Sequence, residues 1–409
     1  MDTEGGISFN QTCAGGLIIG LILLILFFSG LGTFLRTIFT SIATPPLATV
    51  SPTPTQPADA QPASDPLPTV PALSIDQRQT LIQNVSRNIQ IRTNPDNNSQ
   101  PLAFVLEAQT GVPVRSIALN QDESLLATGL ENGVIVVWGL SNLNSSGEVA
   151  VQILAEHTGA VSALAFDWRN SRRLASGSAD ATIKLWDIDA GHSVTTLVGH
   201  TGQVFALGYV PNNPILASGA ADSTIKLWHA DSGQQLANME GHSGQVFSLA
   251  IDASASRMIS GGADNQIIVW DLATQRSVVN LAGHNDWVSD LTFLPTGEQL
   301  ASVSYDKTAR IWTLTPPQAV QLSLKPAPTS ALVSISAHPS GNLLALAASD
   351  NNIYLWNIGA AVEMVLPDQT LTGVTAVKFS PPGHFLAASS QTGAIRLWQV
   401  HAELFNSAP

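Results

Sequence analysis

The sequence predicts an all-β protein, a closed propeller of seven four-stranded blades. Seven tryptophans recur along the chain, separated by 48, 42, 42, 42, 44 and 42 residues. Each of them ends a short apolar run of strand type, such as TIKLW or AIRLW, and turn residues separate such runs. Self-similarity with a period of roughly 40–45 residues is typical of propellers, in which each repeat forms one blade. The seven positions are Trp138, Trp186, Trp228, Trp270, Trp312, Trp356 and Trp398.

Composition and charge limit the classes of function. The chain of 409 residues has a net charge of −13, and charged side chains make up 11% of it. Binding a phosphate backbone needs clustered Lys and Arg, so an acidic chain of this kind is not expected to bind nucleic acid. The single cysteine, Cys13, has no partner for an internal disulfide, and cysteine usage therefore does not reveal the compartment.

Residues 1–13 are predicted to be a short tail, and residues 14–38 a transmembrane helix. The stretch Ala14–Leu35 has 22 residues and no charge; as a helix it spans about 33 Å, enough for a hydrocarbon core of roughly 30 Å. The alternative is a cleaved signal peptide, which usually has a basic n-region and a small-residue cleavage site. The preceding flank contains Asp2 and Glu4 but no Lys or Arg, which favours an uncleaved signal-anchor.

The side of the membrane on which the propeller lies stays open. Arg36 is the only basic residue before Arg78 and follows the apolar stretch, so the positive-inside rule favours a single-pass protein with a cytoplasmic propeller. Residues 39–73 are a linker rich in Pro, Thr and Ala, with nine prolines from Pro45 to Pro71. Because proline fixes φ and lacks an N–H, this linker should be an extended spacer. Such stalks are common outside cells, which favours the opposite side.

Residues 74–99 are predicted to contain a short amphipathic helix and a polar turn. Ser74 and Gln77 have the spacing of a capping box, which marks the start of a helix. Apolar residues then recur at helical spacing and predict a helix over 75–89, followed by a polar turn over 94–100. Whether the helix packs on the propeller is left open. The apolar residues are Leu81, Ile82, Val85 and Ile89.

The propeller is predicted to occupy residues 100–409. In the interval Gly199–Gly241, turns such as PNNP and DSG separate four segments of strand type: VFALGYV, ILASGAA, TIKLW and QQLANME. Only eleven residues follow Trp398, too few for a turn and a full outer strand. The segment Pro101–Ala108 has the same place before the first blade that the outer-strand segment QQLANME has before the repeat that follows it. It should therefore be the outer strand of the seventh blade, which closes the ring and removes an open sheet edge.

Polar residues also recur at fixed distances from the blade tryptophans. An Asp lies six residues before five of them, a Ser or Thr ten residues before five, and a His 28 or 29 residues before four. Together with the Gly-His pairs and the literal Trp-Asp pairs at Trp186 and Trp270, this pattern resembles the WD40 repeat family, over about three quarters of the chain.

The resemblance implies that His, Ser, Asp and Trp of a repeat form a hydrogen-bonded tetrad. A carboxylate buried at a turn needs donors, because its desolvation is otherwise costly. Three blades depart from the pattern: the first has Thr110, Thr128 and Asn132, the sixth has Leu346 beside Asp350 and no His, and the seventh has Ala388 and Thr392. Full tetrads are expected in four repeats: His157, Ser176, Asp180, Trp186; His200, Ser218, Asp222, Trp228; His242, Ser260, Asp264, Trp270; and His284, Ser302, Asp306, Trp312.

The sequence offers little catalytic chemistry. Ser, His and Asp form nucleophilic triads in hydrolases, but here the trio repeats four times at one spacing, as a structural device does and an active site does not. There is no zinc-binding cluster, no calcium loop and no glycine-rich phosphate loop. No catalytic residue, metal ligand or cofactor is predicted.

Residues that follow the His position are candidates for partner contacts. In the family, this part of the repeat lines the top face, where partner peptides dock. When the repeats are aligned, the position of Trp287 is occupied in the other six repeats by Pro, Ala, Gln, Gln, Ala and Gly. A large exposed Trp at such a position suits an interface anchor. The alternative is that it plugs the channel or packs on a neighbouring loop. The candidate contacts are Arg115, Gln203, Phe205, Gln245, Phe247 and Trp287.

These observations favour a membrane-anchored, non-catalytic scaffold for protein–protein interaction, with a monomeric propeller and a protein partner of unknown identity. A second hypothesis is a small-ligand or enzymatic propeller that acts through its central channel, although the sequence shows no cluster of inward-facing carboxylates or histidines. A third is a sensor that signals across the membrane, which would need a partner protein. Fold alone does not decide among them, because propellers serve many functions.

Overall fold

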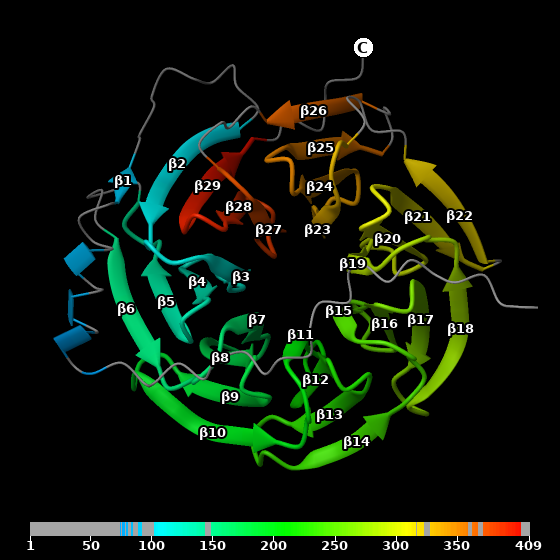
Figure 1. Ribbon diagram of the computed structural model, residues 1–409, viewed down its shortest axis with the longest axis horizontal. Helices are drawn as coiled ribbons and strands as arrows, with labels where there is room; N and C mark the ends of the chain where they lie inside the picture. Colours follow the sequence, from blue (N-terminus) through cyan, green and yellow to red (C-terminus); the bar gives the residue numbers. More distant parts are fainter. Residues whose placement is uncertain are drawn as a thin grey trace, which may run out of the picture. The chain divides into compact units, whose positions relative to one another are not determined.

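The computed structural model describes residues 74, 76–77, 79–80, 83–84, 89–91, 102–143, 149–315, 317–322, 328–358, 362–366 and 371–401. Over these residues seven antiparallel sheets surround one central channel (Figure 1), which confirms the predicted all-β propeller of seven blades. The predicted tail 1–13, transmembrane helix 14–38 and linker 39–73 lie outside the described residues. Within the described part of the chain, no helix has the length and apolar character needed to cross a bilayer.

The strands follow one another in chain order, four to a blade, beginning with blade 1 at β3. They are β1 (Gln90–Ile91), β2 (Leu102–Gln109), β3 (Val114–Leu119), β4 (Leu125–Leu130), β5 (Val134–Gly139), β6 (Ala150–Ala155), β7 (Val161–Asp167), β8 (Asn170–Ser178), β9 (Thr182–Asp187), β10 (His192–Val198), β11 (Val204–Tyr209), β12 (Ile215–Ala220), β13 (Ile225–His229), β14 (Gln235–Met239), β15 (Val246–Ile251), β16 (Arg257–Gly262), β17 (Gln266–Asp271), β18 (Arg276–Ala282), β19 (Val288–Phe293), β20 (Gln299–Ser304), β21 (Ala309–Leu314), β22 (Pro317–Leu322), β23 (Leu332–Ala337), β24 (Leu343–Ala348), β25 (Ile353–Asn357), β26 (Val362–Leu366), β27 (Val374–Phe379), β28 (Phe385–Ser390) and β29 (Ala394–Val400).

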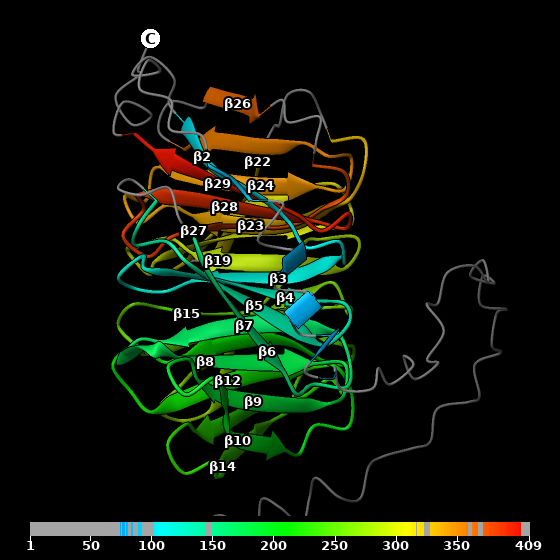
Figure 2. The ribbon, with the colours of Figure 1, turned by 90° about the vertical axis from the view of Figure 1, so that its left-hand side faces the viewer.

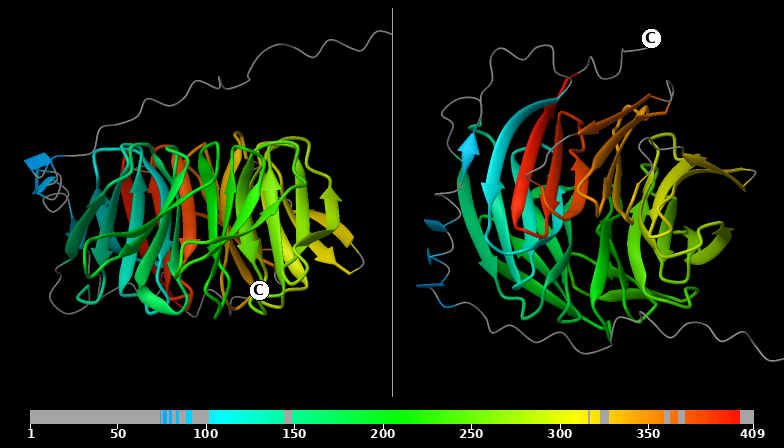
Figure 3. Two further views of the ribbon diagram at one scale, coloured as in Figure 1. Left: turned by 90° about the horizontal axis from the view of Figure 1, so that it is seen from below. Right: turned by 45° about the horizontal axis from the view of Figure 1, so that its top comes forward.

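The first strand of each blade lies innermost, so that β3, β7, β11, β15, β19, β23 and β27 surround the channel (Figure 1). In the turned views the strands run between the two faces of the ring (Figures 2 and 3). One face of the ring carries the turns that contain the tetrad His and Asp residues, and we call it the upper face. The lower face carries the turns between the first and second strands of the blades.

The ring closes through the seventh blade, as predicted from Pro101–Ala108. Strand β2 pairs antiparallel with β29, with Leu106 opposite Leu397 and Glu107 opposite Arg396. The Arg396 guanidinium, almost fully buried, forms an ion pair with Glu107 across this seam. Strand β1 then pairs with β2 and makes this blade five-stranded. The sequence did not predict β1, since a two-residue strand has no periodicity of its own.

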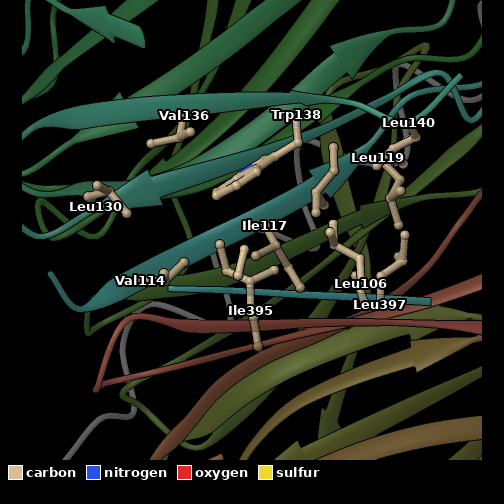
Figure 4. Packing of buried hydrophobic residues seen from close by; sticks show 14 of the residues in the cluster. Leu106, Val114, Ile117, Leu119, Leu130, Val136, Trp138, Leu140, Ile395 and Leu397 are labelled. Atoms are coloured by element: carbon tan, nitrogen blue, oxygen red, sulfur yellow. The ribbon is translucent and has the colours of Figure 1, made fainter. Parts of the chain in front are cut away.

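The core lies between neighbouring blades rather than within any one of them. In the cluster that joins the last and first blades, Trp138 and Ile117 of blade 1 pack with Leu106, Ile395 and Leu397 of blade 7 (Figure 4). Each sheet therefore buries its apolar faces only when the next blade is present, as in other repeat proteins.

The segment before the ring begins with the predicted capping box. The Ser74 N–H donates to Gln77 Oε1 at 2.8 Å, and the Gln77 N–H donates to Ser74 Oγ at 3.2 Å. The described residues from 76 to 84 are helical. The prediction of a helix as far as Ile89 is wrong at its end, because Ile89 is not helical and directly precedes β1. Ile89 packs against the cluster between blades 7 and 1. Leu81, Ile82 and Val85 of the predicted helix, and the polar turn predicted over 94–100, fall outside the described residues.

Candidate functional site

The polar residues predicted to form tetrads are hydrogen-bonded chains in the structure. In blade 3 the Trp228 Nε1–H donates to Ser218 Oγ at 2.8 Å, and Ser218 Oγ lies 2.7 Å from His200 Nε2. His200 Nδ1 lies 2.8 Å from Asp222 Oδ2, which also accepts the Thr201 N–H at 2.9 Å. An N–H on Nδ1 and a Ser hydroxyl that donates to Nε2 satisfy every polar group of this chain with a neutral imidazole.

The other three predicted sets have the same geometry. In each, the Trp donates to the Ser at 2.7–2.8 Å, the His lies 2.7–2.8 Å from the Ser, and 2.8–2.9 Å from the Asp. These sets are His157, Ser176, Asp180, Trp186; His242, Ser260, Asp264, Trp270; and His284, Ser302, Asp306, Trp312.

Burial and hydrogen bonding set the charge states within a tetrad. Burial lowers the pKa of His200 below its usual value, and Asp222 opposes this shift only in part. Burial alone would raise the pKa of Asp222, but hydrogen bonds from the Thr201 N–H, Thr224 and His200 lower it below its usual value. The pKa of Asp180 and of Asp306 is likewise lowered, against burial, with a hydrogen bond from the tetrad His as the largest lowering contribution.

The remaining blades satisfy the same positions with other partners. In blade 1 the Trp138 Nε1–H donates to Thr128 Oγ1 at 3.1 Å, and no His is needed. In blade 6 Asp350 accepts from the Thr329 N–H at 3.0 Å and from Thr329 Oγ1 at 2.9 Å, while the neighbouring Leu346 is fully buried. In blade 7 Thr392 contacts Ser390 Oγ at 2.9 Å.

A recess of about 480 Å³ lies at the upper mouth of the channel. Five of the six predicted contact residues line it, whereas Gln245 is exposed on the same face outside it. Gln245 lies in the loop before β15, and its role as a partner contact on this face stays a prediction. The five that line the recess are Arg115, Gln203, Phe205, Phe247 and Trp287.

Aromatic side chains form a continuous row along one wall of the upper recess. The ring centroids of Phe205 and Phe247 are 5.2 Å apart, those of Phe247 and Trp287 are 5.4 Å apart, and those of Trp287 and Tyr305 are 5.4 Å apart. Trp287 is half-buried in this row, and Tyr305 has 42% of its surface exposed. Trp287 therefore packs on its aromatic neighbours and leaves the recess open.

The opposite wall carries charge. Arg115 of β3 forms an ion pair with Glu131, and their side chains are 42% and 35% exposed. Sequence reasoning found Arg115 but missed Glu131 and Tyr305. A signal existed, because the residue before the tetrad Asp is Ala in blades 2 to 4 and Tyr305 in blade 5.

Below the upper recess, one carboxylate joins four consecutive blades. Asp290 of β19 accepts from Ser248 Oγ at 2.7 Å, from Ser334 Oγ at 2.9 Å and from the Ile335 N–H at 3.0 Å. Lys378 Nζ of β27 lies 3.3 Å from it. Sequence reasoning missed Asp290, although it stands in a column of Ser and Ala in the other six blades. Among the described residues, no group of three or more His, Cys, Asp and Glu could hold a metal ion.

Two family models match the repeats. A model described as "IFT122 first beta-propeller" matches residues 219–407, and "WD domain, G-beta repeat" matches residues 100–139, 148–187 and 191–229. The chain therefore carries WD40 repeats, in agreement with the resemblance drawn from its Gly-His, Asp and Trp-Asp positions.

Curated proteins with similar sequence share only part of the chain. The nuclear distribution protein PAC1 of Komagataella phaffii is 30% identical over 122 residues, 27% of this chain and 24% of that protein. WD repeat and SOCS box-containing protein 1 of Danio rerio is 35% identical over 96 residues, 23% of this chain and 22% of that protein. The WD repeat-containing protein WDS homolog of Arabidopsis thaliana is 32% identical over 87 residues, 21% of this chain and 16% of that protein. The chain thus spans about a quarter or less of the length of these relatives.

Proposed function

Since the seven blades are built from WD40 repeats, we propose that this protein is a membrane-anchored, non-catalytic scaffold that binds a protein partner at the upper recess. Propellers of this kind present rigid faces rather than reactive groups, and proteins with WD repeats are among the curated relatives.

The observation that carries the proposal is the aromatic row in the upper recess. Phe205, Phe247, Trp287 and Tyr305 contact one another in sequence, and Arg115 stands on the opposite wall. Trp, Tyr and Arg are the residues most often found at the energetic centre of protein interfaces, in pockets that a partner desolvates. A preformed row of rings also binds at low entropic cost, because its side chains are already ordered by one another.

A catalytic or small-ligand role for the upper half of the channel has less support. Glu131 is engaged by Arg115 in an ion pair, and hydroxyl and amide donors from blades 4, 5 and 6 already engage both oxygens of Asp290. A carboxylate so engaged is suited to holding blades together and not to abstracting a proton.

The membrane anchor is proposed on sequence grounds. Ala14–Leu35 has no charge over 22 residues, the length that crosses a hydrocarbon core, and the proline-rich linker that follows would hold the propeller away from the bilayer.

The test compares two variants of the full-length chain, in each of which one tryptophan is replaced by alanine. Tagged protein is used to capture partners from membrane extracts, and captured proteins are quantified by mass spectrometry. Trp287→Ala should lose the specific partner, since truncating an interface anchor costs about 2 kcal/mol or more. Trp168→Ala is the matched control, because Trp168 is 46% exposed on the lower face and should retain that partner. Equal capture by both variants would contradict the upper recess as the binding site.

A further inference from the structure

The lower mouth of the channel forms a second recess, separate from the upper one. It has a volume of about 250 Å³ and is lined by the inner strands and first turns of blades 1, 2, 3, 4 and 7. Phe166, Tyr209 and Phe379 form its walls and are each more than nine-tenths buried, at 8%, 4% and 7% exposed. Trp168, 46% exposed, stands at its rim with Pro211 and Pro381. The walls are therefore apolar, aromatic and fixed in the core, as in preformed small-molecule sites.

A single ammonium group stands at the inner end of this lower recess. Among the described residues that line the recess, Lys378 is the only one with a charged side chain. It also lines the narrower cavity of about 190 Å³ in the middle of the channel. The equivalent positions of the other six inner strands are small: Ala118, Ala165, Gly208, Ala250, Thr292 and Ser336. Lys378 thus reaches into space that its neighbours leave empty.

The ammonium group has hydrogen-bonding capacity to spare. Its one hydrogen bond within the described part of the chain goes to Asp290 Oδ2 at 3.3 Å, and its side chain is 37% exposed. An ammonium group can donate three hydrogen bonds. Asp290 does not depend on it, since Ser248, Ser334 and the N–H groups of Leu291 and Ile335 also donate to that carboxylate. Asp290 lines the middle cavity and not the lower recess, so it holds the ammonium from the middle of the channel, and a ligand in the lower recess would meet the ammonium from the other side.

We propose that the lower recess binds a small carboxylic acid with an apolar body, held by an ion pair between its carboxylate and Lys378. The aromatic walls would take the hydrocarbon or aromatic part, and the ammonium would orient the acid group toward the middle of the channel. A charge-assisted hydrogen bond in a partly desolvated site is stronger than a neutral one. The recess therefore selects for the charged acid over a neutral molecule of the same shape. This proposal does not depend on the upper recess.

The experiment titrates the purified full-length chain with 3-phenylpropionate and, separately, with 3-phenylpropanol, by isothermal titration calorimetry in matched detergent buffer. The acid should bind saturably, one molecule per chain, about tenfold more tightly than the alcohol, as one charge-assisted hydrogen bond would give. Lys378→Met should reduce the affinity for the acid to that for the alcohol. Lys378→Arg keeps the charge and should keep the preference for the acid, so it decides the matter if Lys378→Met fails to fold.

Two further variants locate the site. Trp168→Ala should weaken acid and alcohol by the same factor, because it removes wall area and no charge. Arg276→Met is the control: it removes an exposed cation on β18, the outermost strand of blade 4, and should leave both affinities unchanged. Absence of saturable binding, a preference for the acid that survives Lys378→Met, or its loss in Arg276→Met would each overturn the proposal.

Discussion

At the scale of single residues, the tetrads show how one carboxylate organises several donors. Asp222 accepts from His200, from the Thr201 N–H and from both the N–H and the hydroxyl of Thr224. Asp350 occupies the equivalent position of blade 6, but its neighbours there are Thr329 and the Asn352 N–H. The same residue type at the same turn therefore holds a buried imidazole in one blade, and exposed or partly buried groups in the other.

This contrast predicts unequal effects of one substitution. Asp222→Ala removes the acceptor that lies 2.8 Å from the buried His200 Nδ1 and leaves only Thr224 Oγ1, at 3.5 Å. Each unsatisfied buried group costs about 1–3 kcal/mol. Asp350→Ala leaves Thr329 to solvent and should cost about 1 kcal/mol or less. We expect a clearly lower urea midpoint for Asp222→Ala than for Asp350→Ala, with partner binding retained wherever the ring stays folded. Equal midpoint shifts would argue against the tetrad as a stabilising device.

Residue-level prediction from sequence succeeded where a position repeats and failed where it occurs once. The tetrad residues were found because four copies reinforce one another. Trp287 was found because it breaks a column, and the same comparison would have found Tyr305 and Asp290 had it been applied there. Arg115 lies in β3 and Glu131 lies 16 residues later, in the turn after β4, and no local sequence pattern pairs two such positions.

At the scale of elements, neighbouring blades approach closely where a glycine follows the tetrad Ser. A Cβ on Gly219 of β12 would lie 2.6 Å from Val246 Cγ1 at the start of the next inner strand. Gly177 and Gly261 meet Val204 and Val288 in the same way, at 2.5 and 2.6 Å. The missing side chain thus lets the valine of the next blade fill the space between two sheets.

Gly219→Ala should therefore destabilise the ring, since overpacking of a fixed core typically costs about 1–3 kcal/mol. The control lies in the same blade: a Cβ on Gly208 of β11 would meet Ile251 Cδ1 at 3.5 Å, an ordinary contact. Gly208→Ala should be neutral or stabilising by up to about 1 kcal/mol, because glycine in a strand loses more chain entropy. Urea midpoints of the two variants test this. If Gly208→Ala were destabilised and Gly219→Ala were unaffected, close packing between blades would not be the reason for glycine at position 219.

Element boundaries within the repeats were predictable to within a residue or two. In blade 3 the predicted VFALGYV and ILASGAA correspond to β11 and β12, because Gly, Pro and Asp mark the turns between short apolar runs. Ring closure by Pro101–Ala108 was predictable by counting strands. The two-residue β1 was not, since its pairing with β2 depends on where the ring places that edge.

At the scale of the whole molecule, buried histidines link stability to pH. Burial lowers the pKa of His200 and of His338 below the usual value. His338 Nδ1 accepts the Ser340 N–H at 3.1 Å, which only an unprotonated nitrogen can do. The folded protein therefore holds both rings neutral, whereas the unfolded chain protonates them below about pH 6.5.

The free energy of unfolding should be greatest above about pH 6.5 and fall as the pH drops through the lowered pKa values of these histidines. A second fall should begin below about pH 4, where the unfolded chain protonates carboxylates such as Asp222 whose folded pKa is depressed. Urea midpoints between pH 8 and pH 3.5 measure both steps. A urea midpoint that increased as the pH was lowered from 7 to 5 would contradict the conclusion that these buried rings are neutral in the folded protein.

The proposed membrane anchor determines how the full-length chain should fractionate. If residues 14–38 span a bilayer, the full-length chain should sediment with membranes and stay there through high-salt and alkaline washes. Moving 22 uncharged residues from water into the hydrocarbon core buries a large apolar area, which is strongly favourable. A chain beginning at Ser74 keeps the capping box and the ring, and should stay in the supernatant. Salt screens electrostatic contacts but leaves hydrophobic insertion intact. Release of the full-length chain by salt alone would mean that the apolar stretch lies against the membrane surface or a protein and does not span.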